Sequence, residues 1–433
     1  MPRIVFCNFD AMKRTICIII VFGILSSCGS VKSVITKDFN SQFTSPFYKN
    51  HFTGLLVIDA GSKDTVYNLN SHKYFIPASN TKIFTLFTSL KTLPQRIPAL
   101  KYIKLNDTLY FEGTGDPSFL HPYLKDSTVL NFLNKHNNIV YSPGKFEDEK
   151  YGPGWAWDDY QWYYSPEKSN LPIHGNVVMT IGGNEMQVTP TYFKDSVFQL
   201  ANKRNRKEFS NTFFYNAQSK DTVETPFITS NITTKSILEN LLNKKVSLTN
   251  KMPIVQKQTL YGMPIDSLYK RMMHESDNFI AEQLLLVAGS VLKDTLNSKV
   301  IRDYILKNEL YDLEQEPRWV DGSGLSRYNL FTPQNMVSVL ERLFTMVPKE
   351  KLYKIFPAGG MNGTLKNRFI NDDEPYIYAK SGSLSNNYCL SGYLITKTGK
   401  TLIFSFMSNH FRESTSEVKT RLEQMLLRLR DTY

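Results

Sequence analysis

Six serines in the chain are followed by a lysine three residues later, the spacing that brings two side chains together on one helix face. A serine hydroxyl becomes nucleophilic when such a base lies within hydrogen-bond reach. Only Ser79 and Lys82 combine this spacing with a polar entry (residues 77–82) followed by an apolar helical stripe. At a helix start the serine's own N–H also faces a developing oxyanion. The sequence therefore predicts Ser79 as the nucleophile and Lys82 as its base.

The other five pairs lack this entry from loop to helix, and we interpret them as solvated surface. They begin at Ser142, Ser165, Ser267, Ser290 and Ser416.

A second polar element, Ser276-Asp277-Asn278, interrupts a helical pattern over residues 265–290. At such a break, side chains can project into a cleft. The Ser276 hydroxyl can relay a proton to a departing amine, and the Asn278 amide can bind both a lysine and a substrate carbonyl. The alternative is a simple helix N-cap, because Ser, Asp and Asn all favour that position.

A third element, Lys380-Ser381-Gly382, ends a strand pattern. The Lys380 ammonium, together with burial, would lower the pKa of the base. We expect Lys380 and the Ser381 hydroxyl to hold a substrate carboxylate. Gly382 would allow close approach, and the Ser383 N–H would complete an oxyanion hole.

The tripeptide at residues 397–399 is a rival for the third element. It lies between two strand patterns, and there it is typical of a hairpin turn.

Taken in order, the three elements resemble the Ser-x-x-Lys, Ser-Asp-Asn and Lys-Thr-Gly motifs of penicillin-recognising enzymes. The 197-residue interval from Ser79 to Ser276 resembles that of the D-alanyl-D-alanine carboxypeptidase/endopeptidase family, the low-molecular-mass class C penicillin-binding proteins. Those proteins carry a large insertion between the first two motifs. The chain departs in having Lys-Ser-Gly and a somewhat short insertion. Segments that resemble the family's signatures are residues 77–82, 113–117, 154–159, 276–282 and 321–327.

The resemblance implies a serine-type carboxypeptidase or DD-endopeptidase that hydrolyses peptidoglycan stem peptides through an acyl-enzyme and reacts with β-lactams. Either Arg327 or Asp116 is expected to read the rest of the stem peptide. No cofactor or metal is expected. Two alternatives are a β-lactamase and a non-catalytic cell-wall-binding scaffold lipoprotein.

The N-terminus has the pattern of a signal peptide, with Lys13 and Arg14 before an apolar run that ends at Leu25-Ser26-Ser27-Cys28. We predict a signal peptide over residues 1–27, with Met1 or Met12 as the start, and lipidation of Cys28. The protein would then be anchored to a membrane in the bacterial periplasm. The alternative is an ordinary cleaved signal with a chance cysteine.

The remaining cysteine, Cys389, then has no disulfide partner and is interpreted as a buried, inert thiol.

The formal charge is +11, and it is +9 (48 basic, 39 acidic residues) without residues 1–27. This balance favours anionic partners such as an acidic wall polymer. The basic residues are scattered and match no nucleic-acid-binding signature, so no nucleic-acid partner is expected.

The element pattern predicts an α/β protein, and the resemblance implies the penicillin-recognising, serine transpeptidase-like fold. A five-stranded antiparallel sheet with flanking helices would form from strands in residues 51–70 and 376–409. Residues 28–95 and 255–433 would form this catalytic domain, and residues 96–254 a β-rich inserted domain. We interpret residues 29–48 as a polar tether. We also predict a helix over residues 413–429 that packs on the sheet.

Overall fold

The structure is a computed structural model that describes residues 31–182, 186–200, 204–216, 221–371 and 374–433. Its centre is a five-stranded antiparallel sheet in the order β13-β14-β15-β1-β2. The strands are β1 (Phe52–Asp59), β2 (Thr65–Leu69), β13 (Ile377–Leu384), β14 (Asn387–Ile395) and β15 (Thr401–Asn409). β1 pairs with β15 along its whole length, so the two ends of the chain build one sheet as the sequence predicts.

The two faces of this sheet carry separate apolar cores, because successive side chains of a strand point to opposite sides. In β1, Leu56 and Ile58 enter one core, while Leu55 and Val57 enter the other. Helices cover the first core: α2 (Lys82–Thr92), α5 (Asp266–His274), α6 (Asn278–Lys293), α7 (Ser298–Asn308), α8 (Pro333–Met346) and α9 (Lys349–Ile355).

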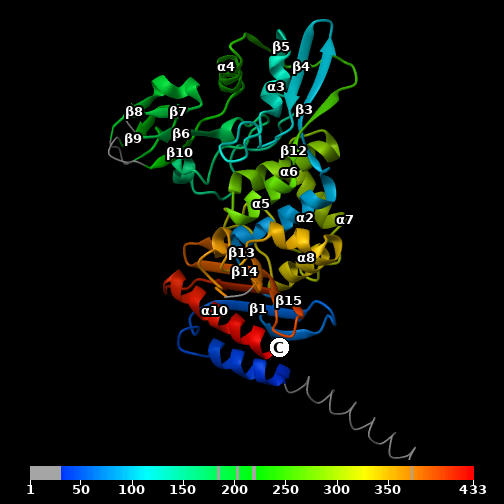
Figure 1. The fold of residues 1–433 in the computed structure, drawn as a ribbon, viewed down its shortest axis with the longest axis vertical. Coiled ribbons are helices and arrows are strands. Elements are labelled where there is room, and N and C mark those ends of the chain that lie inside the picture. Colours follow the sequence, from blue (N-terminus) through cyan, green and yellow to red (C-terminus); the bar gives the residue numbers. More distant parts are fainter. Residues whose placement is uncertain (1–30, 183–185, 201–203, 217–220, 372–373) are drawn as a thin grey trace, which may run out of the picture.

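In the described part of the chain, two helices cover the second core. One of them lies where the sequence predicted a polar tether. α10 (Thr415–Thr432) packs on the sheet as expected, through Val418, Leu422 and neighbouring residues. Beside it residues 31–43 form a helix instead of the predicted tether (Figure 1). Ile35 and Phe39, four residues apart, bury one face of this helix in the same core.

The insertion has its own core and lies at the opposite end of the molecule from the residue 31–43 helix (Figure 1). Its main sheet runs β11-β5-β4-β3-β12. These strands are β3 (Arg96–Leu105), β4 (Thr108–Gly113), β5 (Asn138–Ser142), β11 (Val246–Leu248) and β12 (Gln258–Pro264). Since β12 pairs with β3, the insertion's sheet continues to Pro264, beyond the predicted boundary at residue 254.

Smaller elements complete the insertion. A three-stranded sheet β10-β6-β7 and a β8-β9 pair lie beside two helices. Their bounds are β6 (Val177–Ile181), β7 (Gln187–Thr189), β8 (Val197–Gln199), β9 (Phe213–Tyr215), β10 (Thr222–Pro226), α3 (Thr128–Asn134) and α4 (Asn231–Leu242). Short 3₁₀ helices are η1 (Ala78–Thr81), η2 (Trp157–Gln161), η3 (His174–Asn176), η4 (Thr191–Ser196) and η5 (Gly363–Leu365).

Among the described residues, no helix is both long enough and apolar enough to span a bilayer. The predicted signal peptide and Cys28 lie outside the described residues. Cys389 is a buried free thiol, and burial raises the pKa of that thiol well above its usual value.

The helix at residues 31–43 provides a stability test. Phe39 is 1% exposed and packs edge-on against Tyr67, with ring centroids 5.0 Å apart. Phe39→Ala should lower the free energy of unfolding by about 3–5 kcal/mol, because it leaves a cavity in the second core. Urea unfolding monitored by circular dichroism measures this loss. Val34→Ala, on the exposed face of the same helix, is the control. Equal, small effects of both changes would mean that the helix is a loose tether.

Candidate active site

Ser79 and Lys82 are brought together by a 3₁₀ turn at the entry to α2. The chain leaves Pro77 through Ala78, whose positive φ of 48° turns it sharply into η1. In a 3₁₀ helix, side chains three residues apart eclipse one another, so Ser79 lies directly beside Lys82. Ser79 lines a cavity of about 1200 Å³, whereas Lys82, the first residue of α2, is fully buried.

Lys82 binds three oxygens that come from three separate parts of the chain. Its Nζ lies 3.0 Å from Ser79 Oγ, 2.6 Å from Asn278 Oδ1 and 2.6 Å from the carbonyl oxygen of Ser323. An amide oxygen and a carbonyl oxygen can only accept hydrogen bonds. When Lys82 is neutral, its two N–H groups donate to those two oxygens, and its lone pair is left facing the Ser79 hydroxyl.

The electrostatic environment favours this neutral form. Burial lowers the pKa of Lys82 to about 8, although the nearby carboxylates of Asp321 and Glu282 act in the opposite direction. The amine is therefore a usable base close to neutral pH.

The second motif lies between α5 and α6, as predicted. Ser276 lines the cavity with a positive φ of 57°, a conformation that costs a non-glycine residue energy and is common at functional sites. Asp277 caps α6 by accepting from the Ile280 N–H (3.0 Å), and it also accepts from Arg271 Nε (2.9 Å). Asn278 binds Lys82 through Oδ1, while its Nδ2 donates to the Tyr164 carbonyl at 3.0 Å.

The third motif lies on β13, with alternate residues on opposite sides of the strand. Gly382 faces the nucleophile segment so closely that an added Cβ would stand 2.9 Å from Ser79 N and 2.7 Å from the Pro77 carbonyl oxygen. Ser383 lines the cavity. The approach of β13 to Ser79 thus depends on the absence of a side chain at residue 382.

Lys380 and Ser381 do not line the cavity, and their predicted role in holding a substrate carboxylate stays a prediction. The Lys380 side chain is fully buried, and its Nζ donates to the Ser381 carbonyl at 2.7 Å rather than reaching the cavity surface. Burial, and secondarily the charge of Lys82, hold the pKa of Lys380 well below its usual value. Ser381 Oγ donates to Thr364 Oγ1 at 2.8 Å and lies outside the cavity lining.

The rival tripeptide is a turn, as expected. Residues 397–399 join β14 to β15, and Gly399 has a φ of 80°. Lys397 pairs with Asp431 of α10.

Of the two residues predicted to read the stem peptide, only Arg327 lines the cavity. Asp116 is 2% exposed and accepts hydrogen bonds from the N–H and hydroxyl of Ser118. Burial raises the pKa of Asp116 to about 7. The substrate role predicted for Asp116 is therefore withdrawn, and its contacts are those of a structural residue.

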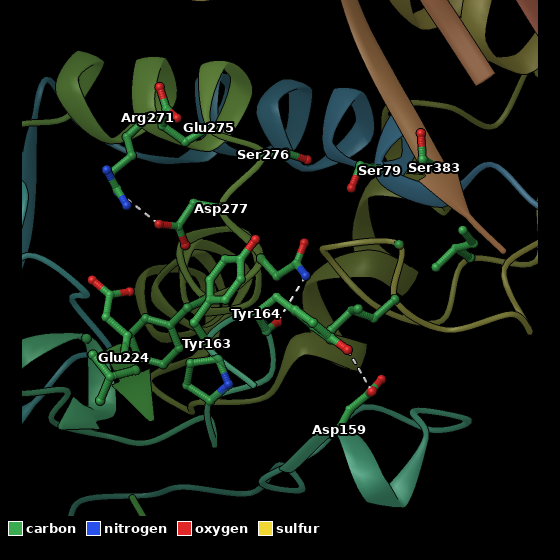
Figure 2. Close-up of a pocket in the computed structure, with 18 of the residues that line it drawn as sticks. Ser79, Asp159, Tyr163, Tyr164, Glu224, Arg271, Glu275, Ser276, Asp277 and Ser383 are labelled. Atoms are coloured by element: carbon green, nitrogen blue, oxygen red, sulfur yellow. Dashed lines mark hydrogen bonds and ion pairs between the residues drawn. The ribbon is translucent and has the colours of Figure 1, made fainter. Parts of the chain in front are cut away.

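Much of the cavity wall comes from the insertion and was not predicted (Figure 2). Asp159 accepts from the Tyr164 hydroxyl at 2.8 Å, and Glu224 accepts from the Tyr123 hydroxyl. The acidic and aromatic run at residues 154–159 was a signal for this wall, but its role depends on the fold. Glu224 had no signal in the sequence, because only the pairing of β10 with β6 carries it to the cavity.

The sequence matches known proteins over most of its length. Residues 35–253 and 245–431 match the model of the D-Ala-D-Ala carboxypeptidase 3 (S13) family. The chain is 23% identical over 450 residues to D-alanyl-D-alanine carboxypeptidase DacB of Haemophilus influenzae, covering 91% of this chain and 92% of the relative. It is also 23% identical to penicillin-sensitive carboxypeptidase A of Dictyostelium discoideum, over 95% and 91% of the two chains.

Solved structures share the fold. The crystal structure of penicillin-binding protein 4 from Haemophilus influenzae aligns with a TM-score of 0.72 at 22% identity, over 90% of this chain and 98% of that chain. A predatory peptidoglycan endopeptidase from Bdellovibrio bacteriovorus aligns with a TM-score of 0.50 at 16% identity, over 87% and 92% of the two chains. The predicted five-stranded sheet with flanking helices is thereby confirmed.

The pKa of Lys82 predicts how reaction with a penicillin depends on pH. Only the neutral amine can take the Ser79 proton, so below pH 8 the acylation rate should fall about tenfold per pH unit. Stopped-flow acylation by a fluorescent penicillin between pH 6 and 10 measures this limb. Thermal melting at each pH confirms that the protein stays folded. A rate that is flat from pH 6 to 8 would contradict the assignment.

Gly382→Ala tests the close approach of β13. The added Cβ meets backbone atoms of the nucleophile segment, so the strand or Ser79 must move. A misplacement of about 1 Å should lower the acylation rate constant roughly 10²-fold. Gly61→Ala is the matched control, since its Cβ would meet only Asp59 Oδ1, at 3.3 Å. A wild-type rate in the Gly382 variant would show that the contact is unimportant.

Proposed function

The chain belongs to the D-Ala-D-Ala carboxypeptidase 3 (S13) family, and we propose that Ser79 is the nucleophile and Lys82 the general base of its reaction. The enzyme is a serine-type D-Ala-D-Ala carboxypeptidase, a hydrolase of peptidoglycan peptides with carboxypeptidase or endopeptidase activity. The hydrogen bonds of Lys82, which leave its lone pair facing Ser79 Oγ, carry this proposal.

In the proposed acylation step, Ser79 Oγ attacks the carbonyl carbon of the penultimate D-alanine while its proton passes to Lys82 Nζ. The developing oxyanion is held between the N–H groups of Ser79 and Ser383. The contact that Gly382 makes with the Ser79 segment supports this pairing, because it brings β13 against that amide.

Collapse of the tetrahedral intermediate breaks the C–N bond, and the leaving amine needs a proton. Ser276, which lines the same cavity as Ser79, relays it from the Lys82 ammonium through its hydroxyl (Figure 2). Water then attacks the acyl-enzyme, Lys82 again takes a proton, and Ser79 is released.

Of the two roles predicted for Lys380, lowering the pKa of Lys82 and holding a substrate carboxylate, the first is supported by an electrostatic interaction between the two lysines. The buried position of Lys380 supports this contribution, because charges interact more strongly in the low dielectric of the interior. Arg327, exposed on the cavity wall with its guanidinium 3.4 Å from the Ser385 carbonyl, is the proposed reader of a carboxylate on the stem peptide.

A membrane anchor at Cys28 would hold the protein in the periplasm. The helix at residues 31–43 follows this cysteine closely and lies at the end of the molecule away from the insertion (Figure 1). An anchor there would direct the cavity toward the cell wall. This arrangement supports the prediction of a lipid-anchored enzyme in the bacterial cell envelope.

Labelling with a fluorescent penicillin tests the nucleophile. Wild-type protein should form a covalent adduct that decays slowly, and Ser79→Ala should form none, since it lacks the attacking oxygen. Ser267→Ala, a change in another Ser-x-x-Lys sequence, is the control and should label normally. Of the other serines with this spacing, the structure buries Ser142, Ser165 and Ser290, which corrects the surface position predicted for them. Product analysis on cross-linked and uncross-linked stem peptides then separates endopeptidase from carboxypeptidase activity. Decay of the adduct within seconds would indicate a β-lactamase, and absence of labelling in the wild type a scaffold.

A further inference from the structure

The two oxygens that orient Lys82 are themselves held in place by other groups. One is the carbonyl of Ser323, whose own N–H donates to the buried carboxylate of Glu282 at 2.7 Å. Asp321 fixes the same loop by accepting from the Gly324 N–H (2.8 Å) and the Ser326 N–H (2.7 Å). The direction in which the Ser323 carbonyl points therefore depends on Asp321 and Glu282.

The insertion binds the outside of this loop at two points. The indole Nε1–H of Trp155 donates to Asp321 Oδ2 at 2.9 Å, and the Ser326 hydroxyl donates to the Pro153 carbonyl at 2.6 Å. Contact is close: a Cβ added to Gly154 would stand 2.8 Å from the Tyr328 ring and 3.1 Å from Ser326 Oγ.

The same stretch of the insertion also orients the second oxygen. The carbonyl of Tyr164 accepts from Asn278 Nδ2, and this bond determines which end of the amide faces Lys82. With Nδ2 held by Tyr164, Oδ1 must point toward Lys82 Nζ, as observed at 2.6 Å. A reversed amide would present a donor to the amine, and the lone pair of Lys82 would no longer be directed at Ser79.

We propose that residues 153–164 of the insertion, here named the insertion clamp, are a positioning element for the general base, and that Trp155 is a positioning residue acting through Asp321. The proposal rests on the proposed role of Lys82. It gives the insertion a part in the chemical step, in addition to the part that its cavity-lining residues play in binding.

The clamp couples substrate binding to catalysis, because the same short segment lines the cavity and contacts the groups that orient Lys82. Asp159 and Tyr163 of the clamp line the cavity (Figure 2), whereas Trp155 donates to Asp321 and the Tyr164 carbonyl accepts from Asn278. A stem peptide bound against the clamp would hold the clamp in the conformation that directs the lone pair of Lys82 at Ser79. Binding energy gained there would then contribute to the rate of acylation as well as to affinity.

Trp155→Phe tests the proposal, because it keeps an aromatic ring and removes only the donor to Asp321. We expect the acylation rate constant with a fluorescent penicillin to fall about 10–100-fold, because the Lys82 amine would no longer be aligned with the Ser79 hydroxyl. Loosening of the loop at residues 321–326 would also admit water to Lys82 and raise its pKa, because burial is what lowers it. The fall of the acylation rate at low pH would then begin at a higher pH. Tyr311→Phe, which removes a polar hydrogen from an aromatic side chain that is 76% exposed and lies outside the clamp, is the control and should behave as wild type.

Ser326→Ala is the second variant, since it removes the other tie to the clamp without changing an aromatic ring. This change should lower the acylation rate constant and shift its pH dependence in the same direction. A thermal melting curve confirms that the variant is folded. Wild-type rates and wild-type pH dependence in both variants would overturn the proposal, as would equal losses in the Trp155 and Tyr311 variants. If the Trp155 variant does not fold, Ser326→Ala decides alone. Failure of the proposed function is a separate result: wild-type protein would then show no Ser79-dependent labelling.

Discussion

The buried amine of Lys82 is the constraint on which the active site depends. A lysine without exposed surface is tolerated only when its polar atoms find partners. Here the partners come from η1, the start of α6 and the loop at residues 321–324, three segments far apart in the chain. The fold must bring these segments together to within hydrogen-bond distance, and doing so both lowers the pKa of the amine and directs it at Ser79.

The central sheet and its two cores provide the rigidity that this convergence needs. β13 comes close to Ser79 only because Gly382 lacks a side chain, and β13 is held in register by β14, which in turn pairs with β15. On the other side of the sheet, α10 and the helix at residues 31–43 complete the second core. The insertion contacts the groups around Lys82 through Trp155, which donates to Asp321, and through the Tyr164 carbonyl, which accepts from Asn278.

Predictions from the sequence held where a local pattern is sufficient and were wrong where a long-range contact decides. The strands at residues 376–409, the break at Ser276 and the hairpin turn at residues 397–399 all have local signals, and the structure has them. The helix at residues 31–43 was missed because its polar sequence needs the sheet to bury Ile35 and Phe39. β12 was assigned to the wrong domain because pairing with β3 has no local signature.

The sequence by itself determined which residues can do chemistry, because the Ser79 and Lys82 side chains meet through the geometry of one turn. It also determined the order of the three motifs and the two-part sheet, since alternation and turn residues are local properties. Only the tertiary structure decided that Lys380 is fully buried, that Asp116 lies outside the cavity lining and that the Asn278 amide points its oxygen at Lys82. The physical reason is that burial and side-chain orientation depend on neighbours contributed by distant segments, whose positions no local spacing encodes.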